Sequence, residues 1–344
     1  MTAARAVWFP RQREVEIREE DLPRLGPEDV HVRTLLSGLS HGTEMLVYRG
    51  EVDPALPLDL PALRGSFAFP IKYGYASVGR VSDAGERVDD ISTGDLVFVH
   101  HPHQTEYVVP ASSVIPLPRE LSAERGVFVA NLETAVNVML DSGLRFAERV
   151  VVFGQGVIGL LIGLLSKRAG AQLLVAVDPV ASRRELATRL GADHALEPHQ
   201  EIAAQIRGLT AGVGADVVVE ASGAPSALDR AIESVAFQGT VVVSSWYGTK
   251  PVPLSLGGAF HRGRVRIVSS QVSSVDPALT PRWSLLRRRE VAVDWLAKLP
   301  LPELITHRLC FDDASKAYRL IDERREEVVQ VVLTYAQQDG PDGV

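Results

Sequence analysis

Three glycines and an aspartate have a spacing that is suited to binding a dinucleotide. Gly154, Gly156 and Gly159 form a GxGxxG pattern directly after the short apolar run 150–153, and Asp178 ends the next apolar run. In such a pattern the first glycine allows a tight turn, the second lets the backbone approach a pyrophosphate, and the third lets helix and strand pack closely. These residues predict a phosphate-binding turn between a strand and a helix.

The residues around the glycines supply the elements that this pattern requires. Residues 157–169 have the composition of an apolar helix, and residues 172–177 form a second apolar run typical of a strand. Backbone N–H groups at the start of the helix, at Val157 and Ile158, would face the phosphates of the ligand. Strand, helix and strand therefore follow one another as in a nucleotide-binding β-α-β unit.

Asp178 indicates which dinucleotide would bind. A carboxylate at the end of the second strand can accept hydrogen bonds from the ribose hydroxyls of an adenosine, whereas it would repel a 2′-phosphate. We therefore expect NAD(H) rather than NADP(H). Arg183 and Arg184 leave NADP(H) open as an alternative, and a glycine turn in another kind of α/β protein is a second alternative.

Composition limits the class of protein. A chain of 344 residues with 46% hydrophobic residues is large enough for two domains with separate cores. A net charge of −7 and a pI near 5.8 argue against nucleic acid or an anionic membrane as a partner. Cys310 is the only cysteine, so neither an internal disulfide nor a thiolate cluster for zinc is expected. The N-terminus lacks a signal-peptide pattern and no apolar run approaches the ~18 residues of a membrane span, which predicts a soluble cytoplasmic protein.

Strand and helix patterns divide the chain into three parts. The first, residues 4–118, contains short β-rich runs broken by Gly and Pro and predicts a β-barrel-like domain, followed by a helical stretch at 122–140. Between residues 149 and 271 strands and helices alternate, which predicts six strands with crossover helices in a doubly wound parallel sheet. That part includes a helix at 227–237 and a strand at 240–244. The third part is helical and charged, with helices at 283–289, 291–297 and 313–321 and a final strand at 328–334.

Motifs along nearly the whole chain resemble the medium-chain dehydrogenase/reductase family, the zinc alcohol dehydrogenase superfamily. They are SGLSHGTE at 37–44, GDLV at 94–97, GQGVIG at 154–159, DPVASR at 178–183, EASG at 220–223 and ITHR at 305–308. The resemblance implies an α/β protein with a GroES-like catalytic domain, residues 1–140 and 272–344, and an inserted Rossmann domain, residues 141–271. It also implies a homodimer, because members pair their sixth strands, here 265–269, across a two-fold axis.

The chain departs from this family where a catalytic zinc would bind. The resemblance implies ligands at three places, where this chain has Ser40 or His41, then Tyr75, and then Ala130. One imidazole cannot make the three-ligand site that a catalytic zinc requires. We therefore expect no metal and a zinc-independent member, similar in pattern to the bacteriochlorophyllide hydroxyethyl dehydrogenase group. That group implies oxidation of a secondary alcohol to a ketone with NAD.

Hydride transfer without a metal still needs a group that exchanges the hydroxyl proton and stabilises the developing alkoxide. The catalytic candidates are Tyr75, His41 and Thr43, since the resemblance places their segments beside the nicotinamide. The alternative for Tyr75 is a ring that fills the space of the missing metal, and for His41 it is a contact with a cofactor phosphate. Glu44 is interpreted as structural, binding backbone or an arginine.

The resemblance implies further cofactor contacts. Thr134 matches a threonine near the carboxamide and ribose of the nicotinamide. Arg183 matches an arginine along the adenosine, with a solvated helix charge as the alternative. Ser222 follows the fourth strand of the sheet, at the carboxyl edge where a dinucleotide runs.

Three histidines, His100, His101 and His103, have a spacing that could chelate a metal. On a strand, His101 and His103 would share one face and His100 would point away. Apart from Glu106, no nearby carboxylate or cysteine completes a ligand set. A polar cleft wall or loop surface is therefore the preferred interpretation.

These observations predict an NAD-dependent, zinc-independent oxidoreductase that interconverts a secondary alcohol and a ketone on a polar or cyclic small molecule. One alternative is an NAD(P)H-dependent reductase of activated double bonds or quinones, against which Asp178 argues. A second alternative is an NAD-binding sensor or scaffold without turnover. The substrate and the direction of the reaction are left open.

Overall fold

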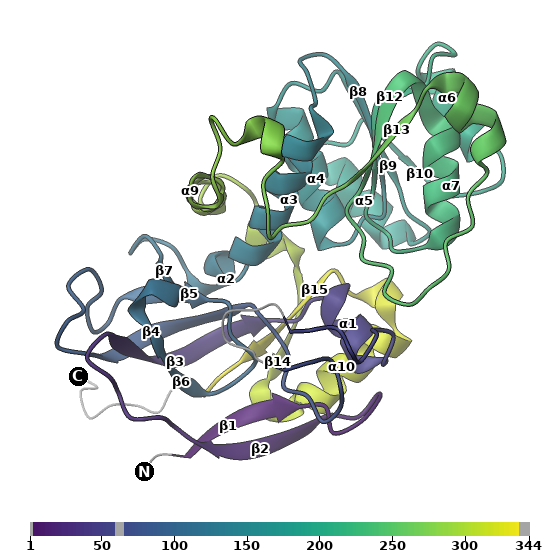
Figure 1. The fold of residues 1–344 in the computed structure, drawn as a ribbon. Helices are drawn as coiled ribbons and strands as arrows, with labels where there is room; N and C mark the ends of the chain where they lie inside the picture. Colours follow the sequence, from purple (N-terminus) through teal and green to yellow (C-terminus); the bar gives the residue numbers. More distant parts are fainter. Residues whose placement is uncertain (1–2, 59–64, 337–344) are drawn as a thin grey trace. The chain divides into compact units, whose positions relative to one another are not determined.

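The computed structural model describes residues 3–58 and 65–336, and it divides into two compact units. Unit 1 comprises residues 1–130 and 296–344, and unit 2 comprises residues 131–295 (Figure 1). The sequence analysis put these boundaries after residues 140 and 271. The structure differs because helix α9 (Leu285–Leu296) packs with helix α3 (Val129–Ser142): Arg288 Nη1 donates to Asn137 Oδ1 at 2.9 Å.

Unit 2 is built on a six-stranded parallel sheet in the order β10-β9-β8-β11-β12-β13. In chain order its strands are β8 (Arg149–Phe153), β9 (Leu173–Val177), β10 (His194–Leu196), β11 (Ala215–Glu220), β12 (Val235–Val243) and β13 (Arg266–Ser269). The order runs outward from β8 in both directions, so the carboxyl ends of β8 and β11 meet at the point where the topology reverses. In open α/β sheets, that is where ligands bind.

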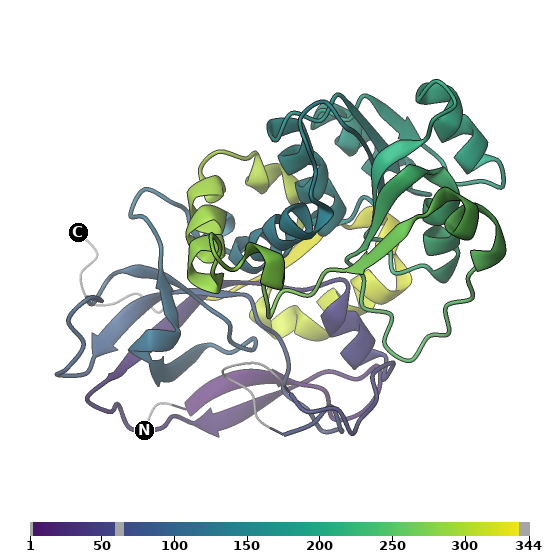
Figure 2. The same ribbon diagram turned by 45° about the horizontal axis from the view of Figure 1, so that its top comes forward.

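Four helices connect these strands and cover both faces of the sheet (Figures 1 and 2). They are α4 (Val157–Arg168), α5 (Ala181–Arg189), α6 (Ile202–Leu209) and α7 (Pro225–Ser234). Because crossovers between parallel strands are right-handed, the reversal at β8 places α4 and α5 on one face and α6 and α7 on the other. The core beside α6 and α7 contains the side chains of Val151 and Phe153 from β8. The predicted doubly wound sheet is confirmed.

Three helices predicted in this part of the chain are wrong in extent. The helix expected at 227–237 ends at Ser234, and β12 begins at Val235, which pairs with Ala215 of β11. A β-branched residue opposite a neighbouring strand gains more from this pairing than from another helical turn. The helices expected at 283–289 and 291–297 are one continuous helix, α9.

Unit 1 is β-rich, as predicted, and contains a seven-stranded sheet and a separate two-stranded ribbon. The sheet strands are β3 (Asp29–Gly38), β4 (Ser77–Ala84), β5 (Leu96–Val99), β6 (Glu106–Pro110), β7 (Val114–Pro116), β14 (Ile305–Cys310) and β15 (Gln330–Thr334); the ribbon is β1 (Ala3–Trp8) and β2 (Glu16–Asp21). β15 pairs with β3, with Val332 opposite Gly38. Segments from both parts of the chain therefore build one sheet.

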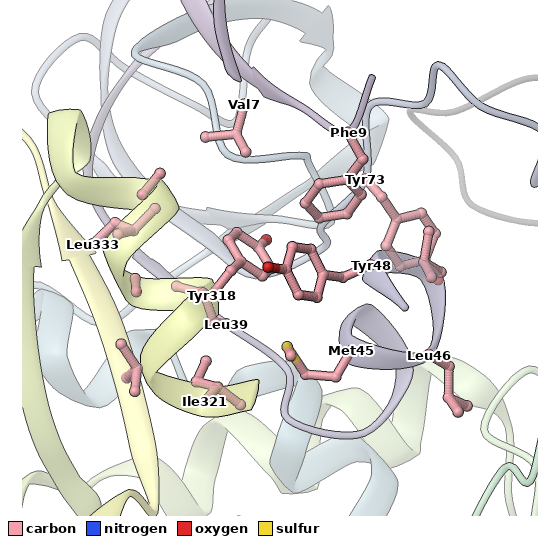
Figure 3. Close-up of a cluster of buried hydrophobic side chains, with 14 of the residues drawn as sticks. Val7, Phe9, Leu39, Met45, Leu46, Tyr48, Tyr73, Tyr318, Ile321 and Leu333 are labelled. Atoms are coloured by element: carbon pink, nitrogen blue, oxygen red, sulfur yellow. The ribbon is translucent and has the colours of Figure 1, made fainter. Parts of the chain in front are cut away.

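The core of unit 1 lies between two short helices and the strands around them. Helix α1 (Thr43–Tyr48), which was not predicted, packs near α10 (Ala314–Glu323), and Figure 3 shows Tyr48 and Tyr318 side by side between them. The two rings stack with centroids 5.4 Å apart, and Phe9 meets Tyr318 edge-on at 5.0 Å. This apolar cluster fixes the N-terminus of α1, where the candidate catalytic residues begin. Within the described ranges, no helix is both long and apolar enough to cross a membrane.

Candidate functional site

The glycine turn of unit 2 has the geometry that its spacing predicts. Gly154 follows β8 with φ of +91°, and a Cβ there would lie 2.6 Å from the Ser222 nitrogen. A Cβ on Gly159 would lie 1.8 Å from the Gly154 oxygen, so helix and turn can approach only without it. A Cβ on Gly156, at the N-terminus of α4, would meet nothing within 4 Å. The first and third glycines thus serve close packing, and the second leaves open space in front of the helix.

That open space lies at a helix N-terminus, which is the environment an anionic group requires. Val157 and Ile158 are the first residues of α4, and N–H groups in a first helical turn have no partner inside the helix. Together with the positive end of the helix dipole they favour a phosphate. The local residues therefore fit the pyrophosphate of a dinucleotide.

Asp178 lies directly after β9 and is 3% exposed. Its Oδ2 accepts a hydrogen bond from the Gln155 N–H at 2.6 Å, and its Oδ1 accepts one from the Val180 N–H at 2.8 Å. Each carboxylate oxygen can accept a second bond. The sequence analysis expected a contact with ribose; the structure adds that Asp178 ties the glycine turn to the end of β9, a role with no sequence signal.

The two arginines that left NADP(H) open have different environments. Arg183 Nη1 lies 3.8 Å from Asp178 Oδ2. Arg184 Nη1 donates to the carbonyl oxygens of Asp178 and Pro179 at 2.7 and 2.8 Å. Its Nη2 lies 3.5 Å from Glu197. The Arg184 guanidinium is therefore engaged by acceptors of its own unit.

Glu220 organises the turn that contains Ser222, although sequence reasoning assigned it no role. This fully buried side chain ends β11. Its Oε1 accepts bonds from the Ser222 N–H at 2.7 Å, the Ser222 hydroxyl at 2.5 Å and the Gly223 N–H at 3.1 Å. Its Oε2 accepts one from the Tyr247 hydroxyl at 2.7 Å, and burial next to this carboxylate raises the pKa of Tyr247. The Ser222 hydroxyl, an expected cofactor contact, thus bonds within the turn. Thr134, the expected contact of the nicotinamide, is half-buried on α3 of the same unit.

In unit 1 the structure brings Tyr75 and Thr43 together, although 31 residues of chain separate them. The side chains of Ser40 and Thr43 lie near the Tyr75 hydroxyl. Burial and, second, the negative charge of Glu44 raise the pKa of Tyr75 to about 12, while the nearby Ser40 and Thr43 side chains act in the opposite direction. Tyr75 is therefore neutral near pH 7 and available as a hydrogen-bond donor. His41 lies in the same turn and is partly buried.

The three histidines do not act as one cluster, because they follow the end of β5 at Val99 and have different partners. His101 stacks on Tyr107 with centroids 3.7 Å apart, and its burial lowers its pKa to about 3. His103 contacts Glu44, whereas the His100 ring lies 3.2 Å from the Tyr75 carbonyl oxygen. In the part of the chain that the structure describes, no group of three or more His, Cys, Asp or Glu side chains could hold a metal.

Glu44 is structural, as interpreted, but it binds no arginine in the bonds that the structure shows. Its Oε1 accepts from the Ser40 N–H at 3.0 Å, and its Oε2 lies 2.9 Å from His103 Nε2 and 2.8 Å from the Tyr318 hydroxyl. Lys72, three residues before Tyr75, bonds to Glu20 and Gln104. Residues far apart in the chain therefore surround the turn that holds Tyr75.

A doubly wound parallel sheet with a phosphate-binding glycine turn, joined to a β-rich unit, defines a nucleotide-dependent enzyme of the dehydrogenase class. The family model described as zinc-binding dehydrogenase matches residues 157–287. The (R,R)-butanediol dehydrogenase of Bacillus subtilis is 31% identical over 277 residues, covering 72% of this chain and 78% of that protein. The D-guloside 3-dehydrogenase of Escherichia coli is 29% identical over 325 residues, covering 89% and 93%.

Solved structures have the same fold. An alcohol dehydrogenase from E. coli CFT073, complexed with NADH, has a TM-score of 0.80 at 20% identity and covers 97% of this chain and all of its own. A zinc-binding dehydrogenase from Sinorhizobium meliloti, bound to NADP, has a TM-score of 0.77 at 20% identity with the same coverage. The chain belongs to the medium-chain dehydrogenase/reductase family, with its GroES-like and Rossmann domains, and is an oxidoreductase.

Proposed function

We propose that this protein is an NAD-dependent, zinc-independent dehydrogenase that interconverts a secondary alcohol and a ketone on a polar or cyclic metabolite. The observation that carries the proposal is the Tyr75 hydroxyl, which lies near the side chains of Ser40 and Thr43 in the segments where the family has zinc ligands. A neutral phenol there can donate a hydrogen bond to the substrate oxygen. In ketone reduction it can then donate its proton to the developing alkoxide.

Zinc does not fit the residues at those positions. A catalytic zinc needs three protein ligands from Cys, His, Asp or Glu. The third position has the methyl side chain of Ala130, and the second has Tyr75, whose pKa is raised rather than lowered. His41 is the one nitrogen ligand available in the first segment. The proposed chemistry therefore assigns the metal's task of stabilising negative charge to hydrogen-bond donors, with the Tyr75 hydroxyl first, and the Thr43 hydroxyl and the His41 imidazole beside it.

Unit 2 supports NAD as the cofactor. The N-terminus of α4, with Val157 and Ile158, would hold the pyrophosphate and Asp178 the adenosine ribose, while Arg183, Thr134 and Ser222 remain proposed contacts. A bound nicotinamide would supply or accept the hydride. Asp178 is buried and close to Gln155 and Val180, so a 2′-phosphate would meet a fixed carboxylate. The relatives bind NADH in one case and NADP in another, so the choice depends on the residues of this chain.

Names of relatives support a small polar substrate. They include dehydrogenases of D-guloside, (R,R)-butanediol, sorbitol and L-threonine. Each name specifies a molecule with a hydroxyl group near other polar groups. We therefore propose a sugar, cyclitol or similar polyol as the substrate class.

The test is a spectrophotometric screen of nicotinamide reduction with NAD or NADP and a panel of alkyl hexosides, butanediols, sorbitol, cyclitols and L-threonine. Turnover with NAD on at least one secondary alcohol is expected, also after treatment with a strong zinc chelator. Turnover only of enones or quinones with NADPH would favour the double-bond reductase instead. NAD binding without oxidation of any member of an extended alcohol panel would favour a sensor.

A further inference from the structure

A buried carboxylate lies directly behind the turn that holds Tyr75. Glu44 is fully buried, and its hydrogen-bond donors and contacts are the Ser40 N–H, His103 Nε2 and the Tyr318 hydroxyl, all within 3.0 Å. Burying a carboxylate is costly unless hydrogen bonds compensate it. Here each of the two oxygens has a donor. Glu44 is therefore a fixed anchor, not a mobile surface charge.

His103 is the second member of this anchor and is equally buried. Its Nδ1 lies 2.7 Å from Ser37 Oγ, which lies 2.8 Å from the Tyr335 hydroxyl. Both ring nitrogens are thus engaged, so the imidazole is held in one orientation. The bonds fit a neutral ring that donates from Nε2 to Glu44 and accepts at Nδ1 from Ser37.

The pair contacts both segments that position the Tyr75 hydroxyl. On one side, the Ser40 N–H bond to Glu44 holds the turn whose Ser40 and Thr43 side chains lie near the Tyr75 hydroxyl. On the other side, the His103 ring packs against the backbone of Gly74, because a Cβ there would lie 2.8 Å from that ring. Gly74 has φ of +136° and immediately precedes Tyr75. The hydrogen bond between Glu44 and His103 therefore sets the position of the Tyr75 hydroxyl relative to the Ser40 and Thr43 hydroxyls.

We infer that Glu44 and His103 are positioning residues, which hold the Ser40–Thr43 turn and the Gly74–Tyr75 segment in the register that aims the Tyr75 hydroxyl. This inference rests on the proposed function, in which Tyr75 contacts the substrate oxygen. His103 and the Tyr318 hydroxyl contact Glu44, and after burial its negative charge contributes to the raised pKa of Tyr73, Tyr75 and Tyr335. The negative charge of Glu44 also favours the neutral, proton-donating form of Tyr75.

The first experiment is a double-mutant cycle between Glu44→Gln and Tyr75→Phe, assayed with NAD and the alcohol that has the highest turnover in the screen above. A misplaced donor costs about 10- to 100-fold in rate, so kcat of Glu44→Gln should fall by that factor with the KM for NAD unchanged. If Glu44 acts through Tyr75, the substitution should add little loss in the Tyr75→Phe background. A loss of the same factor in both backgrounds would overturn the inference, and so would unchanged kcat in Glu44→Gln.

Tyr318→Phe is the milder variant, should Glu44→Gln fold poorly, because it removes one bond to Glu44 and leaves the carboxylate. The matched control is Tyr107→Phe, which removes the buried bond from the Tyr107 hydroxyl to Ser77 Oγ at 2.9 Å and does not contact the pair. Tyr318→Phe should lower kcat several-fold through Tyr75, again non-additively, whereas Tyr107→Phe should retain the parent kcat. Equal effects of the two variants would show a general packing effect and overturn the inference.

Hydrogen exchange of the protein without substrate separates this inference from the proposed function. Amides of a peptide spanning residues 38–46 should exchange faster in Glu44→Gln and at the parent rate in Tyr107→Phe. Unchanged exchange in that peptide would overturn the inference whatever the substrate. A different result would be faster exchange of this peptide in Glu44→Gln together with parent-like turnover of Tyr75→Phe. That result would overturn the role of Tyr75 as the donor to the substrate oxygen. It would also overturn the inference that Glu44 and His103 position such a donor.

Discussion

Tyr75→Phe removes the hydroxyl proposed to bind the substrate oxygen and keeps the ring. If the hydroxyl is a transition-state donor, kcat should fall by ~10²–10³-fold, as for the loss of one oxyanion donor. The affinity for NAD should be unchanged, because the glycine turn and Asp178 lie in unit 2. Steady-state kinetics in both directions, together with NAD titration by protein fluorescence, measures these quantities.

The structure also sets the stability cost of this substitution. The Tyr75 hydroxyl lies near the Ser40 and Thr43 side chains, and the loss of one buried polar interaction costs about 1 kcal/mol. We therefore expect the free energy of unfolding of Tyr75→Phe to fall by about 1 kcal/mol, measured by urea denaturation. Tyr107→Phe loses one buried hydrogen bond and should lose a similar amount of stability without loss of kcat. Parent-like kcat in Tyr75→Phe would refute the donor role and transfer it to His41 and Thr43.

Three further predictions concern the cofactor, the metal and pH. Asp178→Asn keeps one acceptor oxygen and removes the negative charge, so the affinity for NAD should fall roughly ten- to a hundredfold and the preference for NAD over NADP should decrease. Fluorescence titration with both cofactors measures these affinities. Equal binding of NAD and NADP to the parent protein would contradict the prediction. Dialysis against a strong zinc chelator should leave fold and turnover intact, whereas about one tightly held zinc per chain by elemental analysis, with activity lost on its removal, would refute zinc independence. Burial lowers the pKa of His101 to about 3, below the ~6.5 of the unfolded chain, so its stabilising contribution is complete above pH 6.5 and declines as pH falls from there toward 3. His101 can therefore change the free energy of unfolding by at most about 1.4 kcal/mol per pH unit. The His101→Phe variant can keep the stacking on Tyr107. Its free energy of unfolding, measured by urea denaturation, should fall less between pH 7 and pH 5 than that of the parent protein.

Local sequence determined the nucleotide-binding part of this protein. Gly154, Gly156 and Gly159 lie within six residues of one another, and the close contact of Gly159 is with the Gly154 oxygen of the same turn, although Gly154 itself also approaches Ser222. Such short-range constraints leave a pattern in the chain. The alternation of strands and helices likewise predicted the six-stranded sheet, because right-handed crossovers allow few other arrangements. The end of α7 was mispredicted where strand pairing, a non-local contact, outweighed helix propensity.

Only the tertiary structure decided what surrounds Tyr75. The Ser40 and Thr43 side chains near its hydroxyl come from a turn more than thirty residues earlier, and Glu44 is joined to His103 and Tyr318 across 59 and 274 residues of chain. His103, grouped with two neighbouring histidines by its spacing, belongs instead with Glu44, because the chain leaves β5 before these residues and sends their side chains to different partners. Sequence order carries no record of such contacts. They form because buried polar groups must find donors and acceptors wherever the folded chain brings them.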